Sequence, residues 1–139
     1  MKIDFTKLKI GDRLIREKGG IFSKHHVLYA GRDSITGKHI IAENQRNYGV
    51  RIISLEQFLK EGKLVQIDYN NFSYPQQTKT TLRIKTRLGK SYDLLKYNCE
   101  QFVNDVLHGI IESKQVQNAL FASFGVLVLF MVLLLSKQH

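Results

Sequence analysis

The chain has 139 residues, 43% of them hydrophobic, so it can bury one core of ordinary size and has no room for a second catalytic domain. Its formal net charge of +9 favours polyanions, whether nucleic acid or an anionic lipid surface, and charge alone does not choose between them. The single cysteine excludes an internal disulfide, and the first residues lack the apolar run of a signal peptide, so we expect the domain to face the reducing cytosol.

A turn and two strands are the first elements that the sequence predicts. Residues 11–12, Gly-Asp, favour a turn, and a short strand is expected around residues 14–15. The run KHHVLYA at residues 24–30 predicts a second strand. Because side chains alternate between the faces of a strand, His25 and Tyr29 would share one face of it.

The middle of the chain predicts a hairpin partner for this strand, two more strands and a short helix. Strands are expected at residues 39–44, 50–53 and 64–68. The first of these would pair with residues 24–30 as a hairpin. Ser54 with Gln57 three residues later forms a capping box, which predicts a short helix ending near Lys60.

The next segment predicts a loop and then an amphipathic element. Residues 69–79 hold the only proline among several polar residues, so we expect an exposed loop. Residues 80–88 favour a helix ending at Gly89, although their alternation also fits an exposed strand. The basic side chains of this region either face lipid headgroups or form a solvated surface; they are Lys79, Arg83, Lys85 and Arg87.

Apolar side chains recur at helical spacing from Tyr92 onward and predict the principal helix of the domain, ending at Gly109. They are Leu95, Cys99, Phe102, Val103, Val106 and Leu107. A polar joint follows. We therefore divide the chain into a folded domain at residues 1–112, a linker at 113–118 and an apolar tail at 119–135.

The tail predicts a membrane span. Residues 119–135 carry no charge, and as a helix they would extend about 25 Å, close to the roughly 30 Å of a hydrocarbon core. A helix that is apolar on every face does not suit the surface of so small a domain. The preceding residues carry a net charge of +8, and each basic residue near an anionic leaflet contributes about 1 kcal/mol. We therefore expect lipid, and not nucleic acid, as the partner.

Cys99 and His25 are the residues most suited to catalysis. Cys99 lies near the start of the principal helix, where unpaired N–H groups and the helix dipole stabilise a thiolate. An imidazole within reach could take the thiol proton and later return it to a leaving group. This pair is used in acyl transfer. The sequence does not show that the two side chains meet, and a lone cysteine is otherwise a small buried hydrophobic residue.

Several ordered motifs carry a resemblance to a known family. They are Gly11-Asp12, the run His25 to Gly31 (H-x-x-x-Y-x-G), Asn98-Cys99-Glu100-Gln101-Phe102-Val103, and Tyr92 seven residues before the cysteine. At these residues the chain resembles the lecithin:retinol acyltransferase and phospholipase A/acyltransferase family of the NlpC-type papain-like superfamily. The resemblance implies an α+β domain of permuted papain-like type, with a small antiparallel sheet packed on the Cys-bearing helix, and a C-terminal transmembrane anchor.

The resemblance also implies a reaction in lipid metabolism. In such proteins the cysteine attacks an ester of a glycerophospholipid, releases a lysophospholipid and holds the acyl group as a thioester, which water, an amine or a lysolipid then resolves. The chain would thus be a phospholipase A, a hydrolase, and an acyltransferase. We expect no cofactor and no metal, because the histidines and the cysteine show no ligand spacing.

His25 fits the base of this family better than His26, because it stands four residues before Tyr29. His26 is expected to be a half-buried strand residue, and Tyr29 to be a supporting residue packed in the core. The best-known members of the family orient the base with a second histidine on the next strand. This chain has none at that point.

Glu43 is our first choice for the orienting group and Asn44 the second, since neighbouring strand residues face opposite ways and only one can reach His25. His39 is a weaker candidate. The backbone N–H of Cys99 is expected to stabilise the oxyanion, with Asn98 and Glu100 as capping residues that support the site.

Two other functions fit the same sequence. One is a cysteine peptidase or amidase on the same fold, and the other is a non-catalytic membrane adaptor that binds through its basic face. Loss of reactivity at Cys99 without loss of biological effect would favour the adaptor.

Overall fold

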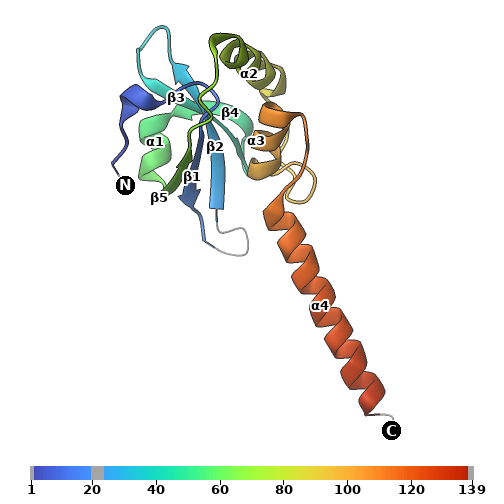
Figure 1. Ribbon diagram of the computed structural model, residues 1–139. Coiled ribbons are helices and arrows are strands. Elements are labelled where there is room, and N and C mark those ends of the chain that lie inside the picture. The colour runs from blue at the N-terminus through green and yellow to red at the C-terminus, as the bar shows by residue number, and fades with distance from the viewer. Residues whose placement is uncertain (1, 20–23, 138–139) are drawn as a thin grey trace.

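The computed structural model describes residues 2–19 and 24–137, which form an α+β domain and a long C-terminal helix (Figure 1). The domain elements are η1 (Phe5–Lys7), β1 (Arg13–Glu17), β2 (Lys24–Arg32), β3 (His39–Gln45), β4 (Gly49–Ser54), α1 (Leu55–Lys60), β5 (Leu64–Asp68), α2 (Tyr74–Arg87) and α3 (Cys99–His108). The last helix is α4 (Lys114–Ser136). The strand order is β4-β3-β2-β1-β5, and each strand is antiparallel to its neighbours.

The central strand β2 contributes side chains to two hydrophobic cores, one on each face of the sheet. Val27 and Tyr29 point to the face covered by α1, where they pack with Phe58. Leu28 points to the opposite face and packs with Phe102 of α3. Both phenylalanines are fully buried, and such burial contributes about 1.5–3 kcal/mol for each side chain. The two-residue period of β2 therefore joins both layers of the domain.

All five predicted strands are present, and one half of the capping box predicted for α1 is confirmed. The side-chain oxygen of Ser54 accepts a hydrogen bond from the backbone N–H of Gln57 at 3.1 Å. The side chain of Gln57 donates to Glu61 at 3.2 Å and does not return to Ser54. The pairing of β2 with β3 as a hairpin is also confirmed. These elements were predictable because alternation and capping are local properties of the chain.

The loop predicted at residues 69–79 is wrong over its second half, because α2 begins at Tyr74. Ser73 and Gln76 form a capping box, and Pro75 occupies a first-turn position where its missing N–H is tolerated. The helix predicted at residues 80–88 is correct as the second half of α2. The proline that indicated a loop therefore lies in the first turn of a helix.

The helix predicted from Tyr92 is also too long, because α3 begins only at Cys99. Asp93 accepts hydrogen bonds from the backbone N–H groups of Leu95 and Lys96, which closes a turn in front of the helix. Leu95 is 55% exposed and does not belong to the core. The predicted end is right, since Gly109 caps α3 in the left-handed conformation with φ of 70°.

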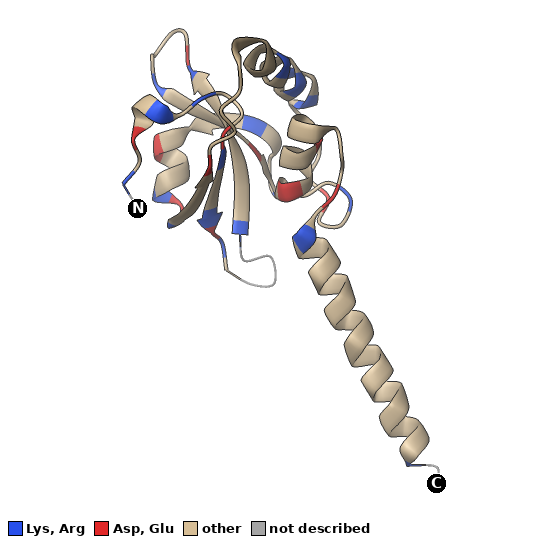
Figure 2. Cartoon of the chain, viewed as in Figure 1, with Lys and Arg blue, Asp and Glu red and all other residues tan. Residues whose placement is uncertain are grey.

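The linker predicted at residues 113–118 is helical from Lys114 onward. Ser113 is the N-cap of α4, and its side-chain oxygen accepts a hydrogen bond from the N–H of Val116 at 3.2 Å. Figure 1 shows α4 extending away from the domain, and Figure 2 shows no charged residue along most of it. With a mean hydropathy of 2.6 and none of its most apolar window buried, α4 is long and apolar enough to cross a membrane.

The basic residues of α2 have two different environments. Arg83 donates a hydrogen bond to the carbonyl of Val106 at 3.0 Å, and Arg87 forms a bidentate pair with Asp105 at 2.8 and 2.9 Å. Both guanidinium groups therefore hold α2 against α3. Lys79 and Lys85 are exposed. They lie on α2, at the end of the domain away from α4 (Figure 1).

Candidate active site

Cys99 is the first residue of α3, and Asn98 fixes that start. The side-chain oxygen of Asn98 accepts hydrogen bonds from the backbone N–H groups of Glu100 and Gln101, both at 3.0 Å. In return, the side-chain oxygen of Gln101 accepts a hydrogen bond from the N–H of Asn98 at 2.8 Å. This capping box places the thiol at the positive end of the helix dipole.

The thiol of Cys99 lies beside His25 at the start of β2. It is 3% exposed, and its sulfur is 3.8 Å from the carbonyl oxygen of Lys24. Burial raises the pKa of the thiol, but interaction with the His25 imidazole and its positive charge outweighs burial and lowers that pKa. Burial likewise lowers the pKa of His25, and interaction with Cys99 and Glu43 raises it overall. Both shifts favour a thiolate–imidazolium pair.

Glu43 holds the imidazole from the other side. The Nε2 atom of His25 is 2.7 Å from Oε2 of Glu43, whose side chain is fully buried. Oε1 of Glu43 accepts a hydrogen bond from Nε of Arg51 at 2.8 Å. Although burial raises the pKa of Glu43, contact with His25 and Arg51 lowers it overall, so the carboxylate is charged. Among the described residues, Nδ1 of His25 has no conventional hydrogen-bond partner, which leaves that nitrogen for proton exchange with the thiol.

The other candidates for the orienting group lie elsewhere. Asn44 faces the opposite side of the sheet, where its side-chain nitrogen donates to the carbonyl of Tyr97 at 2.7 Å. His39 pairs through Nδ1 with the hydroxyl of Tyr29 at 2.7 Å, and Tyr29 is otherwise buried in the core. Of the predicted groups, the structure brings Glu43 alone to His25.

His26 and Glu100 lie on the face opposite to His25. His26 is only 5% exposed, so the half-buried position predicted for it is wrong. Burial is the main cause that lowers its pKa, to about 4, so the ring is neutral at neutral pH. Glu100 does not cap its own helix: its Oε2 accepts hydrogen bonds from the hydroxyl of Ser113 and, at 3.1 Å, from the N–H of Gln115. It caps α4 and ties that helix to the catalytic one.

Two residues near the site were not predicted as part of it. Arg51 pairs with Glu43, and the strand alternation could have indicated this because the two residues are opposite each other in the β3–β4 register. Tyr92 was quoted only as part of a motif. Burial, with a smaller effect of the nearby Cys99, raises the pKa of its hydroxyl to about 12, so Tyr92 is neutral.

Replacing Asn98 with alanine tests the helix start. We expect Asn98→Ala to lower the free energy of unfolding by about 0.5–2 kcal/mol, because two N–H groups at the start of α3 lose their acceptor. Urea unfolding of the full chain in detergent micelles measures this. Asn47→Ala, at an exposed turn position, is the control and should stay within about 0.5 kcal/mol. Equal changes in both variants would contradict the capping role.

Replacing Glu43 with glutamine tests the orienting contact. We expect Glu43→Gln to lower kcat by at least about 10²-fold with little change in KM, because the neutral amide no longer stabilises the imidazolium. The pH profile of Cys99 alkylation should also move to higher pH. Glu56→Gln is the matched control, since Glu56 is an exposed carboxylate on α1. A loss confined to KM, or an unmoved alkylation profile, would contradict this role.

Comparison with known proteins gives the family. Residues 7–123 match the sequence model of a protein family, which is described as permuted papain-like amidase enzymes, YaeF/YiiX, C92 family. This range includes Cys99, His25 and the whole sheet. A search of curated proteins found no match. The papain-like superfamily inferred from the motifs is therefore confirmed, whereas the lecithin:retinol acyltransferase family within it is not shown. The chain belongs to the C92 family of permuted papain-like amidases.

Proposed function

We propose that this protein is a membrane-anchored cysteine amidase that forms a thioester acyl-enzyme on Cys99. One observation supports this most strongly: the thiol at the start of α3 lies beside His25, which in turn is bound to Glu43 at 2.7 Å. Family membership supports a cysteine-type hydrolase, and the apolar helix α4 supports the anchor.

The arrangement can carry out acyl transfer in two steps. The Cys99 thiolate attacks the carbonyl carbon of the scissile amide, and the His25 imidazolium gives its proton to the departing amine as the C–N bond breaks. His25, now neutral, takes a proton from water as that water attacks the thioester. The carboxylic acid leaves as the C–S bond breaks, and the thiolate–imidazolium pair is restored. Glu43 stays ionised throughout and holds the imidazole in position.

The oxyanion of each tetrahedral intermediate needs a donor next to the sulfur. Cys99 is the first residue of α3, so its own N–H has no acceptor within the helix. It is the donor that we assign to the oxyanion, with the dipole of α3 adding to its effect.

Transfer of an acyl group from a phospholipid ester is the second candidate. It is favoured by the exposed apolar surface of α4, which would bring the thiol to the level of the lipid headgroups, and it uses the same thioester. The released group would be a lysophospholipid instead of an amine. Water or another acceptor would complete either reaction.

Intact-mass spectrometry of the full chain in nanodiscs tests both candidates. The protein is exposed in parallel to N-acyl amide lipids and to phosphatidylcholine, and the mass of an acyl adduct on its one thiol is measured. The proposal expects a hydroxylamine-sensitive adduct from the amides. An adduct from phosphatidylcholine alone would favour the second candidate. If no adduct forms and Cys99 fails to react with a soft electrophile, the adaptor function holds instead.

A further inference from the structure

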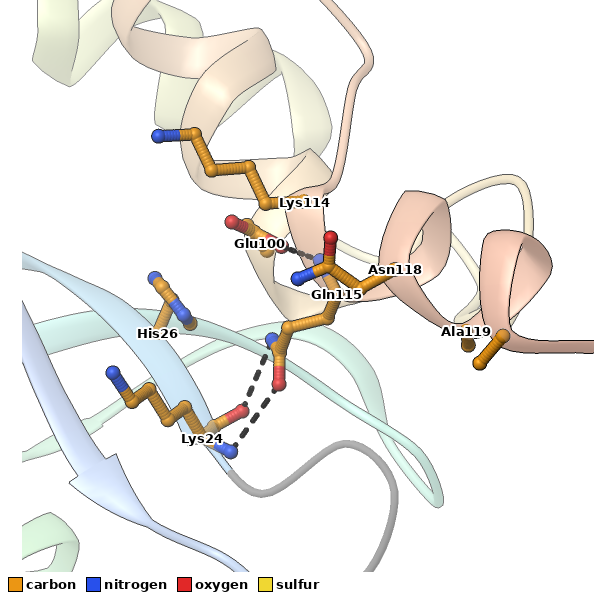
Figure 3. Close-up of a pocket in the computed structure, with 8 residues that line it drawn as sticks. Lys24, His26, Glu100, Lys114, Gln115, Asn118 and Ala119 are labelled. Carbon is orange, nitrogen blue, oxygen red and sulfur yellow. Dashed lines mark hydrogen bonds between the residues drawn. The ribbon is translucent and has the colours of Figure 1, made fainter. Parts of the chain in front are cut away.

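A cavity of about 510 Å³ lies between the start of β2 and the first turns of α4 (Figure 3). It is lined by Lys24, His26, Glu100, Lys114, Gln115, Asn118, Ala119 and Ala122. The side-chain amide of Gln115 forms hydrogen bonds with the backbone N–H and carbonyl of Lys24, at 3.3 and 3.4 Å. That same carbonyl contacts the sulfur of Cys99 at 3.8 Å. The backbone of Lys24 therefore lies between the cavity and the thiol, and Cys99 itself is not among the residues that line the cavity.

The charges around the cavity favour an anion. Lys24 and Lys114 are both exposed and carry ammonium groups into this region. The one acidic residue, Glu100, is 5% exposed, and its carboxylate is already bound by Ser113 and Gln115. An anion in the cavity would thus meet two cations and a carboxylate engaged elsewhere.

His26 supplies an unused polar group in the wall of the cavity. His26 is only 5% exposed. Within the part of the chain that the structure describes, its Nδ1 atom has no hydrogen-bond partner. A buried polar atom without a partner is unfavourable by about 1–3 kcal/mol. Because the ring is neutral at neutral pH, it can donate one hydrogen bond to a ligand without adding charge.

One side of the cavity is formed by the apolar helix α4. Ala119 and Ala122 lie one turn apart on α4, and the residues beyond them are exposed and apolar. If residues 119–135 occupy the hydrocarbon core, residues 114–118 extend about 7 Å above it, which is the level of lipid headgroups. A ligand that fills the cavity and continues along the two alanines must then be amphiphilic.

We propose that this cavity binds the anionic headgroup of a membrane lipid. Lys24 and Lys114 bind the phosphate of the headgroup, His26 donates a hydrogen bond to it, and an acyl chain lies along Ala119 and Ala122. The helix α4 is then one wall of the lipid site as well as the proposed anchor. This binding does not depend on the proposed amidase function.

Photo-crosslinking in nanodiscs tests the binding separately from catalysis. Full-length Cys99→Ala protein is placed in phosphatidylcholine nanodiscs that contain a trace of diazirine-labelled phosphatidylglycerol, and the labelled peptides are identified by mass spectrometry. Label is expected on residues 114–122. Lys24→Ala and Lys114→Ala should each lower this labelling by about fivefold, the effect of one basic residue near an anionic headgroup. Lys85→Ala, the same change on the exposed face of α2, should leave it unchanged.

Three results would overturn the inference. They are labelling that is unaffected by either lysine substitution, labelling that is equal with a diazirine phosphatidylcholine probe, and competition by glycerol 3-phosphate as strong as competition by unlabelled phosphatidylglycerol. The last result would indicate a soluble anion as the ligand. If labelling follows the prediction while the wild-type protein never acquires an acyl group, the lipid site stands and the proposed amidase function fails.

Discussion

Cys99→Ser is expected to lower kcat/KM by about 10³-fold or more and to remove the acyl adduct from the intact mass. The serine hydroxyl fits the same buried position at the start of α3, but it does not ionise at neutral pH, so the ion pair with His25 is lost. Substrate turnover and intact mass are measured on the same preparation in nanodiscs.

Circular dichroism serves as the control for Cys99→Ser, because the variant keeps the Asn98 cap and should keep the helical signal of the wild type. Wild-type turnover in a well-folded Cys99→Ser protein would contradict covalent catalysis at this residue. It would also leave the adaptor function as the better explanation.

His25→Ala is expected to lower kcat by about 10³-fold or more, since the thiol loses its proton acceptor and the amine loses its proton donor. The matched control is His26→Ala, which removes the same atoms from the neighbouring position of β2. His26 faces the cavity beside α4 and not Glu43, so this control should keep most of its kcat. Equal loss of kcat in the two variants would contradict the assignment of His25 as the base.

The sheet was predictable from the sequence because each strand follows local rules. The alternation in β2 correctly placed His25 and Tyr29 on one face, and the same rule excluded either Glu43 or Asn44 from reaching the base. It did not show which of the two does so, because that depends on the register between β2 and β3. That register contains an irregularity between Tyr29 and Gly31.

The start of α3 shows why helix boundaries were harder to predict. The spacing from Tyr92 onward fits a helix, yet Asp93 closes a turn with its own side chain before Asn98 begins the helix. A short polar side chain that bonds nearby N–H groups competes with helix formation. The spacing of apolar residues gives no sign of this competition. The cap residue Asn98 was the better signal.

The motif from Asn98 to Val103 now has a physical explanation at each position. Asn98 and Gln101 form the capping box of α3, Cys99 carries the thiol, and Glu100 caps α4. Phe102 and Val103 fill the core against β2. Most of these roles concern the folding of the site. Such a motif therefore identifies the papain-like superfamily but carries little information on the acyl donor. The family model that matches the chain is one of amidases, whereas the motifs indicated a phospholipid acyltransferase.

The role of Glu100 could not have been predicted from spacing within one helix. Its partners, Ser113 and Gln115, lie at the start of the next helix, and their contact depends on how the first turn of α4 lies against β2. This contact fixes the first turn of the apolar helix beside the thiol. It also holds the start of the predicted linker at residues 113–118 against the helix that carries Cys99.

The thiolate–imidazolium pair is tested most directly by the pH dependence of Cys99 alkylation. The lowered pKa of Cys99 means that the thiolate persists below the ordinary thiol pKa of about 8.5, and the raised pKa of His25 keeps the imidazolium charged over the same range. Rates with iodoacetamide are measured by intact mass for the wild type and for His25→Ala. In the wild type the rate should stay high below that pH. In His25→Ala its midpoint should move upward, because the largest effects that oppose burial are lost and only the smaller ones of the His26 N–H and Lys18 remain. Two superimposable profiles, each with the midpoint of an ordinary thiol, would contradict the pair.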